Sequence, residues 1–134
     1  MSTPLIPDAI MARLIANGAA EVEGDPVPPL KLFNPVGPGR WLITEILADA
    51  DTLFGLCDLD QGFPELGYVS LDEIEAVRLP HGFRIERDPH FVGRMPLSMW
   101  ARMAQRLGSI FAAEEIVRLM AGHAQDGPGK PGPS

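Results

Sequence analysis

The chain of 134 residues carries a net charge of −7 and a single cysteine, Cys57. A chain of this length buries roughly two-thirds of its unfolded surface, which suffices for one domain without disulfides or metals. A lone cysteine cannot form an internal disulfide, and this favours a cytoplasmic setting. The N-terminus lacks the pattern of a signal peptide, and no apolar run approaches the ~20 residues that span a bilayer. We therefore expect a cytoplasmic protein with no membrane contact.

Acidic and basic residues are separated along the chain. Residues 41–77 contain nine acidic residues and no Lys or Arg, whereas residues 78–118 contain seven Arg against four acidic residues. Because Arg binds carboxylates in a bidentate manner, the two segments can neutralise each other within the fold. Alternatively, the acidic segment faces a basic partner. Direct nucleic-acid binding is not expected, since phosphate contacts need surface Lys and Arg.

The first half of the chain predicts a helix followed by four short strands. Residues 6–17 form the helix, with Pro7 near its start, Asn17-Gly18 at its end and an apolar stripe between them. That stripe comprises Ile10, Met11, Leu14 and Ile15. The strand ranges are 30–33, 40–46, 52–57 and 65–70. The short turns between these strands indicate an antiparallel meander.

A short capped helix follows the fourth strand directly. Ser70 and Glu73 form a capping box, in which the Ser70 hydroxyl accepts from the Glu73 N–H and the Glu73 carboxylate reaches back to the Ser70 N–H. Leu71, Ile74 and Val77 share one face of this helix. The pattern explains how a sheet edge and a helix are held together, and it names no reaction.

The second half predicts a fifth strand and two further helices. Apolar and charged residues alternate over 83–87, which is typical of a half-buried strand. Pro96 opens a helix that ends at Gly108, and Ser109 caps a last helix that we expect to end at Gly122. The domain would then span 1–122, with a disordered Gly/Pro-rich tail over 123–134.

These two C-terminal helices contain many large apolar side chains. The stripe expected on the first comprises Leu97, Trp100, Met103, Ala104 and Leu107. The stripe expected on the second comprises Ala112, Ile116, Leu119 and Met120, with Phe111 beside it. The helices either cover the open face of the sheet or dock a second copy or another protein. Glu114 and Arg118 are spaced for an i,i+4 ion pair on the last helix.

Two glutamates are the candidates for acid–base chemistry. Glu45 and Glu65 would form a general acid and base if their strands were neighbours. An ion pair of either one with Arg84 or Arg87 is the alternative. Cys57 is interpreted as a small buried thiol rather than a nucleophile, which would need a base and a route to a substrate.

A metal site is not expected. Glu86, Asp88 and His90 occupy alternate positions, so in an extended chain they would point to the same side and could bind a metal. Pro89 interrupts the strand, however, and no other cluster of His or Cys exists. Salt bridges and turn capping are the simpler roles for these side chains. We expect no cofactor.

Three motifs, taken in order, resemble those of a known bacterial family. They are Glu65-Leu66-Gly67-Tyr68, Ser70-Leu71-Asp72-Glu73-Ile74-Glu75 and Glu86-Arg87-Asp88. With them the chain resembles the domain-of-unknown-function family 2958 from about Leu5 to Ser98. The resemblance implies a small protein carried on plasmids, phages and other mobile genetic elements, with no assigned activity. The family's recurring polar positions correspond to Thr44, Glu45, Glu65, Tyr68, Ser70, Glu73, Glu86, Arg87 and Asp88.

We therefore expect an α+β domain with a small antiparallel sheet of four to five strands, an N-terminal helix, a short capped helix and two C-terminal helices. The first functional hypothesis is a non-enzymatic interaction protein of a mobile genetic element. Its acidic segment would bind the basic surface of a host-defence or nucleic-acid-handling protein.

The alternatives are a small enzyme that uses Glu45, Glu65, Arg87 and Asp88 in a cleft, and a homodimer joined by the C-terminal helices. The expected functional surface comprises Glu45, Asp49, Asp51, Asp58, Asp60, Glu65, Tyr68, Arg87 and Asp88.

Overall fold

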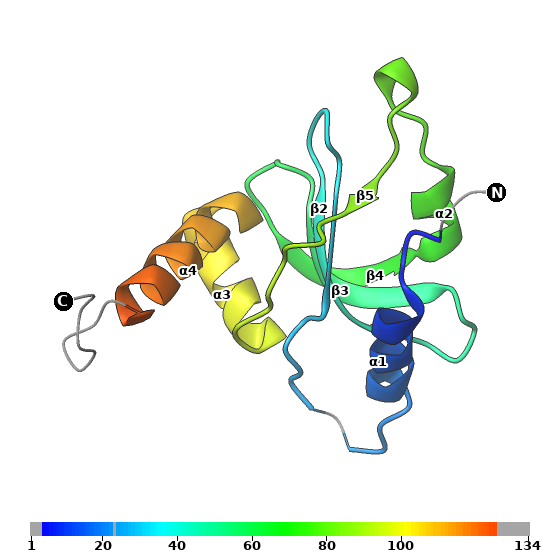
Figure 1. Cartoon of the computed structure of the whole chain (residues 1–134), viewed down its shortest axis with the longest axis horizontal. Coiled ribbons are helices and arrows are strands. Elements are labelled where there is room, and N and C mark those ends of the chain that lie inside the picture. Colours follow the sequence, from blue (N-terminus) through cyan, green and yellow to red (C-terminus); the bar gives the residue numbers. More distant parts are fainter. Residues whose placement is uncertain (1–3, 23, 126–134) are drawn as a thin grey trace.

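The computed structural model describes residues 4–22 and 24–125, which form a five-stranded antiparallel sheet with a pair of helices on each face (Figure 1). The helices are α1 (Asp8–Gly18), α2 (Leu71–Ala76), α3 (Leu97–Leu107) and α4 (Ile110–Gln125). The strands are β1 (Leu30–Phe33), β2 (Arg40–Ile46), β3 (Thr52–Asp58), β4 (Glu65–Ser70) and β5 (Glu86–Arg87). The α+β prediction is thereby confirmed.

The strands lie in the order β4-β3-β2-β1-β5. The first four follow one another as the expected antiparallel meander, and the last returns to pair with β1. Consequently β4 and β5 form the two edges of the sheet.

The fifth strand is shorter than the alternation over 83–87 predicts, because it holds only Glu86 and Arg87. Two features of the chain limit it. Its partner β1 ends at Phe33, opposite Glu86, and the following Asn34 already turns the chain by accepting the Val36 N–H. The Phe83 carbonyl in turn accepts the Leu79 N–H across a tight turn.

Strand register places alternate side chains against two separate apolar cores. One face of the sheet, which includes Ile43 and Leu53, packs on α1 and α2 through residues such as Leu14 and Ile74. The other face packs on α3 and α4. Its residues Leu42 and Leu56 form a cluster with Trp100 of α3 and with Ile110 and Ala113 of α4. Figure 1 shows the two helix pairs on opposite sides of the strands.

Glycine allows α1 to lie directly on the sheet. A Cβ atom at Gly18, the last residue of α1, would overlap the carbonyl oxygen of Ile46. In the same region the Asn17 side chain donates to the Thr44 carbonyl at 2.8 Å, where β2 is bulged between Ile43 and Glu45. The Asn17-Gly18 pair thus ends the helix, as expected, and also joins it to β2.

The buried face of α4 differs from the expected one. Ile110, Ala113 and Val117 are buried, whereas Leu119 is 69% exposed. The expected stripe instead faces outward, together with Phe111, because contacts near the start of α4 fix the rotation of the helix. The helix also continues through Gly122 to Gln125, and residues 126–134 of the expected tail lie outside the described residues.

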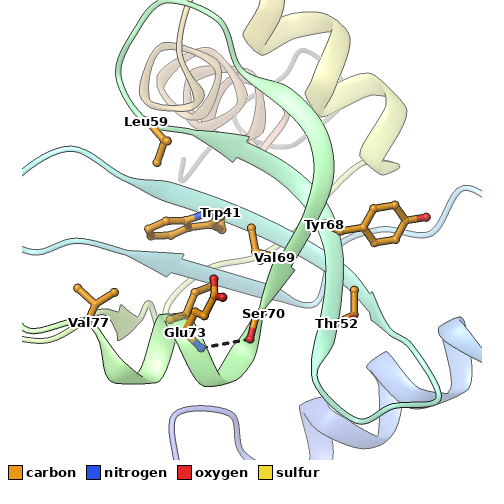
Figure 2. Close-up of a pocket in the computed structure, with 9 residues that line it drawn as sticks. Trp41, Thr52, Leu59, Tyr68, Val69, Ser70, Glu73 and Val77 are labelled. Carbon is orange, nitrogen blue, oxygen red and sulfur yellow. Dashed lines mark hydrogen bonds between the residues drawn. The ribbon is translucent and has the colours of Figure 1, made fainter.

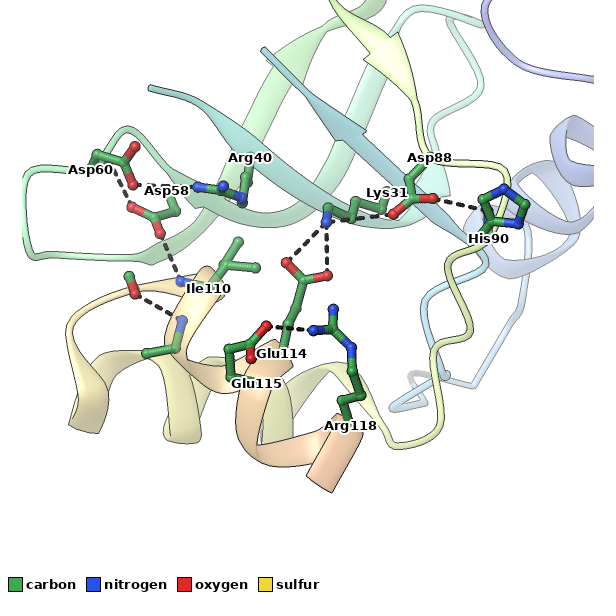
Figure 3. A network of polar contacts seen from close by, with 12 residues as sticks. Lys31, Arg40, Asp58, Asp60, Asp88, His90, Ile110, Glu114, Glu115 and Arg118 are labelled. Atoms are coloured by element: carbon green, nitrogen blue, oxygen red, sulfur yellow. Dashed lines mark hydrogen bonds and ion pairs between the residues drawn. The ribbon is translucent and has the colours of Figure 1, made fainter. Parts of the chain in front are cut away.

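The expected ion pair between Glu114 and Arg118 does not form. The Glu114 carboxylate instead binds Lys31 on β1 at 2.7 Å, and Arg118 binds Glu115 (Figure 3). The Lys31 and Glu114 side chains are each only 12% exposed, so this pair ties α4 to the sheet. The sequence shows that Glu114 and Arg118 are four positions apart, but it does not show that Lys31 of the sheet lies opposite Glu114.

The N-terminus of α3 is held by a residue far away in the chain. Asp25 accepts hydrogen bonds from the backbone N–H and the hydroxyl of Ser98, and these bonds hold the pKa of Asp25 below its usual value. On the buried side of the helix, the Trp100 indole donates to the Gly93 carbonyl at 2.7 Å.

Among the described residues, no helix is long and apolar enough to span a bilayer.

Candidate functional site

The carboxylates of the acidic segment, residues 41–77, are not neutralised by the downstream arginines. Within the described residues, the one ion pair of this segment joins Asp60 to Arg40 at 3.7 Å, and Arg40 precedes the segment. Arg78 and Arg84 instead donate to backbone carbonyls at the end of α2. The interpretation in which the two segments cancel each other is therefore wrong.

Two acidic residues of the β2–β3 turn have structural roles. Asp49 accepts hydrogen bonds from the N–H and hydroxyl of Thr52 and from the N–H of Asp51. The bonds from Thr52 are the main cause of a pKa of Asp49 below its ordinary value. Asp51 accepts from the Ser70 hydroxyl and the Asp72 N–H, each at 2.8 Å.

Asp51 thereby completes the cap of α2. The Ser70 hydroxyl accepts from the Glu73 N–H at 3.2 Å, as the capping box predicts. The second expected bond, in which the Ser70 N–H donates to the Glu73 carboxylate, is absent from the described residues, and Asp51 instead accepts from the Ser70 hydroxyl and the Asp72 N–H. The Glu73 carboxylate is consequently left exposed at the surface.

Asp58 does not belong to the surface, contrary to expectation. It is fully buried and accepts hydrogen bonds from the backbone N–H groups of Asp60 and Ile110 (Figure 3). These two donors, one in the following loop and one at the N-terminus of α4, satisfy the buried carboxylate. It joins the end of β3 to the first residue of α4.

Four of the remaining acidic side chains form an exposed group around the edge strand β4, whereas Glu45 and Glu75 are half-buried. Glu65 opens the strand, Asp60 lies in the loop before it, and Asp72 and Glu73 lie on the helix after it. Tyr68 lies in the middle of β4 and is 64% exposed. These five residues are called the β4 surface below.

The four residues of the predicted catalytic cleft are not brought together. Glu45 on β2 and Glu65 on β4 are separated by β3, and their partners on β3 are Phe54 and Cys57. Arg87 lies on the opposite edge strand, and Asp88 directly follows it. Since neighbouring strands are about 4.8 Å apart, roughly 19 Å separate the two edges.

Asp88 and Cys57 have structural explanations. Asp88 binds Lys31 at 3.5 Å and accepts the His90 N–H, which agrees with salt bridging and turn capping. Burial raises the pKa of the Cys57 thiol to about 11, so that the thiol stays protonated at neutral pH. Among the described residues, no three His, Cys, Asp or Glu side chains are grouped as metal ligands.

A hollow of about 530 Å³ lies on the face of the sheet that carries α2 (Figure 2). Trp41, Val69 and Val77 form its apolar floor and walls, and the charged side chain lining it is Glu73. Tyr68 also lines this hollow but points away from Trp41 and Val69.

A larger hollow of about 860 Å³ lies on the other face of the same edge. It contains Phe54, Leu66 and Tyr68, with the Phe54 and Tyr68 ring centroids 5.0 Å apart. Its charged lining residues are Glu21, Asp25 and Glu45, and no Lys or Arg lines either hollow within the described residues. The edge strand is thus flanked on both faces by concave, apolar and acidic surfaces.

Several of these lining residues were not singled out from sequence. By their local pattern, Trp41 and Phe54 are ordinary strand residues. Their position in the two hollows depends on how the helices pack around β4, which no local pattern encodes.

A family model described as a protein of unknown function, DUF2958, matches residues 5–111. No curated protein and no solved structure matches the chain. The match extends beyond Ser98, the expected end of the resemblance, and so includes α3 and the first two residues of α4. The chain therefore belongs to the DUF2958 family of proteins of unknown function.

Proposed function

We propose that this protein is a non-catalytic binding protein, which presents its β4 surface to the basic surface of a protein partner. The observation that carries the proposal is the exposure of Glu65, Asp72 and Glu73 without an ion-pair partner among the described residues. Exposed like charges repel one another and so destabilise the compact state. An opposite charge on a partner would give them a role.

The dispersal of the candidate catalytic residues supports binding over catalysis. A general acid and base must both reach the reacting atoms within hydrogen-bond distance or through one water. Glu45, Glu65 and Arg87 lie on separate strands, and Asp88 is engaged by Lys31. The predicted enzyme is therefore the weaker hypothesis.

The proposed partner is a nucleic-acid-handling protein of the host, including those that act in host defence. Such proteins carry surface Lys and Arg for phosphate contacts, and an acidic surface competes for the same residues. The resemblance to proteins of mobile genetic elements adds a biological setting in which this competition would be useful.

A pull-down from bacterial cytoplasm with matched charge variants tests the proposal. The test variant, E65Q/E73Q, changes two exposed carboxylates beside β4. The control, D8N/E86Q, changes two exposed carboxylates on α1 and on the opposite edge strand. Both variants lower the negative charge of the chain by two.

The expected result is a basic partner that the native protein and D8N/E86Q retain and that E65Q/E73Q loses. Retention by the native protein should also fall between low and moderate salt, because salt screens exposed charges. Equal retention by both variants, or a complex that is indifferent to salt, would contradict the proposal.

A second candidate is a homodimer formed through α4. The favouring observation is its outward apolar stripe, in which Phe111, Leu119 and Met120 are more than half exposed. Such a stripe is typical of interaction surfaces. Light scattering should show a dimer for the native chain and a monomer for Leu119→Glu, whereas a native monomer at high concentration would rule out the dimer.

A further inference from the structure

We infer that β4 is a site of strand addition, at which an extended, basic segment of the protein partner joins the sheet as a sixth strand. This inference rests on the proposed function, from which it takes the basic character of the partner. It goes further by naming the backbone of Leu66 and Tyr68 as the point of attachment and an alternating peptide as the ligand.

The register determines which backbone groups of β4 face outward. The Leu71 N–H donates to the Asp51 carbonyl at 2.9 Å, in line with the β3–β4 register. Hydrogen-bonded residues alternate along an antiparallel pair. Glu65, Gly67 and Val69 therefore face β3, whereas the N–H and C=O groups of Leu66 and Tyr68 point away from the sheet.

The edge lacks the features that usually prevent strand addition. Protected edge strands are short, bulged or interrupted by Lys or Pro. β4 has six residues, pairs with β3 without a shift in register, and contains neither Lys nor Pro. The opposite edge is protected by comparison, because β5 has only two residues.

The two hollows beside β4 suit the alternating side chains of an added strand. Successive side chains of a strand point to opposite faces of a sheet, and peptides that add to an edge are selected by pockets for these side chains. One hollow offers Trp41 and Val69 on the α2 face, and the other offers Phe54 and Leu66 on the α3 face.

The charge of the hollows identifies the kind of segment that would bind. Glu73 borders one hollow, Glu21 and Glu45 border the other, and neither is lined by a cation in the described part of the chain. In a segment that alternates basic and apolar residues, the Lys or Arg side chains would meet the carboxylates of one hollow, and the apolar side chains would pack on the apolar walls of the other. An acidic or neutral polar segment would gain neither contact.

The test uses the full chain and an octapeptide of alternating Lys and Val with blocked ends. Amide hydrogen exchange is followed by NMR with and without the peptide. We expect exchange at the Leu66 and Tyr68 N–H groups to slow by about tenfold at saturation, because each would then be held in a hydrogen bond.

Two variants at one position separate the backbone from the side chain. Tyr68→Thr and Tyr68→Pro both remove the ring, but only Pro removes the outward N–H, and an edge strand tolerates Pro where its N–H faces solvent. Loss of a hydrogen bond should make the peptide bind Tyr68→Pro about tenfold more weakly than Tyr68→Thr. The exchange measurement on the native chain keeps the test valid if Tyr68→Pro folds poorly.

The possible outcomes separate this inference from the proposed function. Salt-sensitive peptide binding that is lost in E65Q/E73Q but leaves the Leu66 and Tyr68 amides unprotected would overturn strand addition and retain the acidic surface. A peptide that does not bind would also overturn strand addition, and the pull-down then decides the proposed function separately. Protection that rises with protein concentration without peptide would identify a second copy as the added strand and overturn the choice of partner.

Discussion

The buried carboxylate of Asp58 accepts a hydrogen bond from the backbone N–H of Ile110 at 2.7 Å, across 52 positions of the sequence. Ile110 is the first residue of α4, so the carboxylate satisfies one of the free N–H groups at the helix N-terminus. Ser109 satisfies another through its hydroxyl, which accepts from the Ala112 N–H at 3.0 Å. These contacts fix where α4 begins and how it is rotated on the sheet.

Replacing Asp58 by Ala should destabilise the protein. The Ile110 N–H would be left buried without a partner, at a cost of about 1–3 kcal/mol in the free energy of unfolding. Asp60→Asn, two residues later, keeps a residue type that tolerates the left-handed backbone of this position and breaks only an exposed pair with Arg40, so it should cost less than about 1 kcal/mol. Denaturant unfolding compares the two variants, and equal losses would show that the cap does not hold α4.

Two adjacent glutamates on α4 should respond differently to the same substitution. Glu114→Gln removes the nearest carboxylate of the largely buried Lys31 and leaves Asp88 at 3.5 Å as its remaining ion-pair partner, which should cost about 1.5–3 kcal/mol. Glu115→Gln loses an exposed pair with Arg118, and its effect should stay within about 0.5 kcal/mol. Thermal unfolding at neutral pH gives the comparison, and similar melting temperatures for both variants would contradict it.

Two glycines that lie opposite each other on β3 and β4 should also differ. A Cβ at Gly55 would overlap the carbonyl oxygen of Leu42, whereas a Cβ at Gly67 would meet nothing within 4 Å. Gly55→Ala should therefore destabilise by about 1–3 kcal/mol through overpacking. Gly67→Ala should be neutral or slightly stabilising, since it restricts the unfolded chain. Denaturant midpoints in the reverse order would refute this.

Asp49 should contribute to stability in a way that depends on pH. Its pKa lies below the ordinary value of 3.8 chiefly because the Thr52 hydroxyl donates to it. A carboxyl whose pKa is lowered on folding stabilises the protein above the unfolded value, and the contribution is lost as the pH falls through the folded value.

Thr52→Ala should move the pKa of Asp49 up toward 3.8 and make the loss of stability in acid shallower. NMR titration of the Asp49 carboxyl and unfolding measured across the acid range provide the two readouts. An Asp49 that titrates at its ordinary value in the native protein would remove the basis for this expectation.

Cys57 should be unreactive in the folded protein. Burial raises its pKa to about 11, and the thiolate rather than the thiol reacts with alkylating agents. Alkylation by iodoacetamide near neutral pH should therefore be slow in the native state and fast in denaturant. Equally fast labelling in both states would show that the thiol is accessible and ionised.

Local pattern was enough to predict most of the secondary structure. The strands β1 to β4 have the expected positions, and the start of α2 follows from Ser70 and the N–H of Glu73. These features depend on neighbours in the chain, namely turn residues, alternation and a helix cap. The family and the α+β class followed from the same local information.

The functions of the charged residues could not be predicted in this way. Asp58 and Glu65 belong to the same acidic run, but one is buried beneath α4 and the other is exposed at an edge. Glu114 was assigned to Arg118 by spacing, although Lys31 is its partner across 83 positions. Such long-range pairs depend on which strand or helix happens to lie opposite.

Sequence alone determined the order of helices and strands, the concentration of negative charge in residues 41–77 and membership of the family. Tertiary structure decided which carboxylates remain exposed, which face of α4 is buried and that β4 is an open edge between two hollows. The physical reason is that periodicity specifies the conformation of a segment, whereas burial and pairing depend on the elements packed against it.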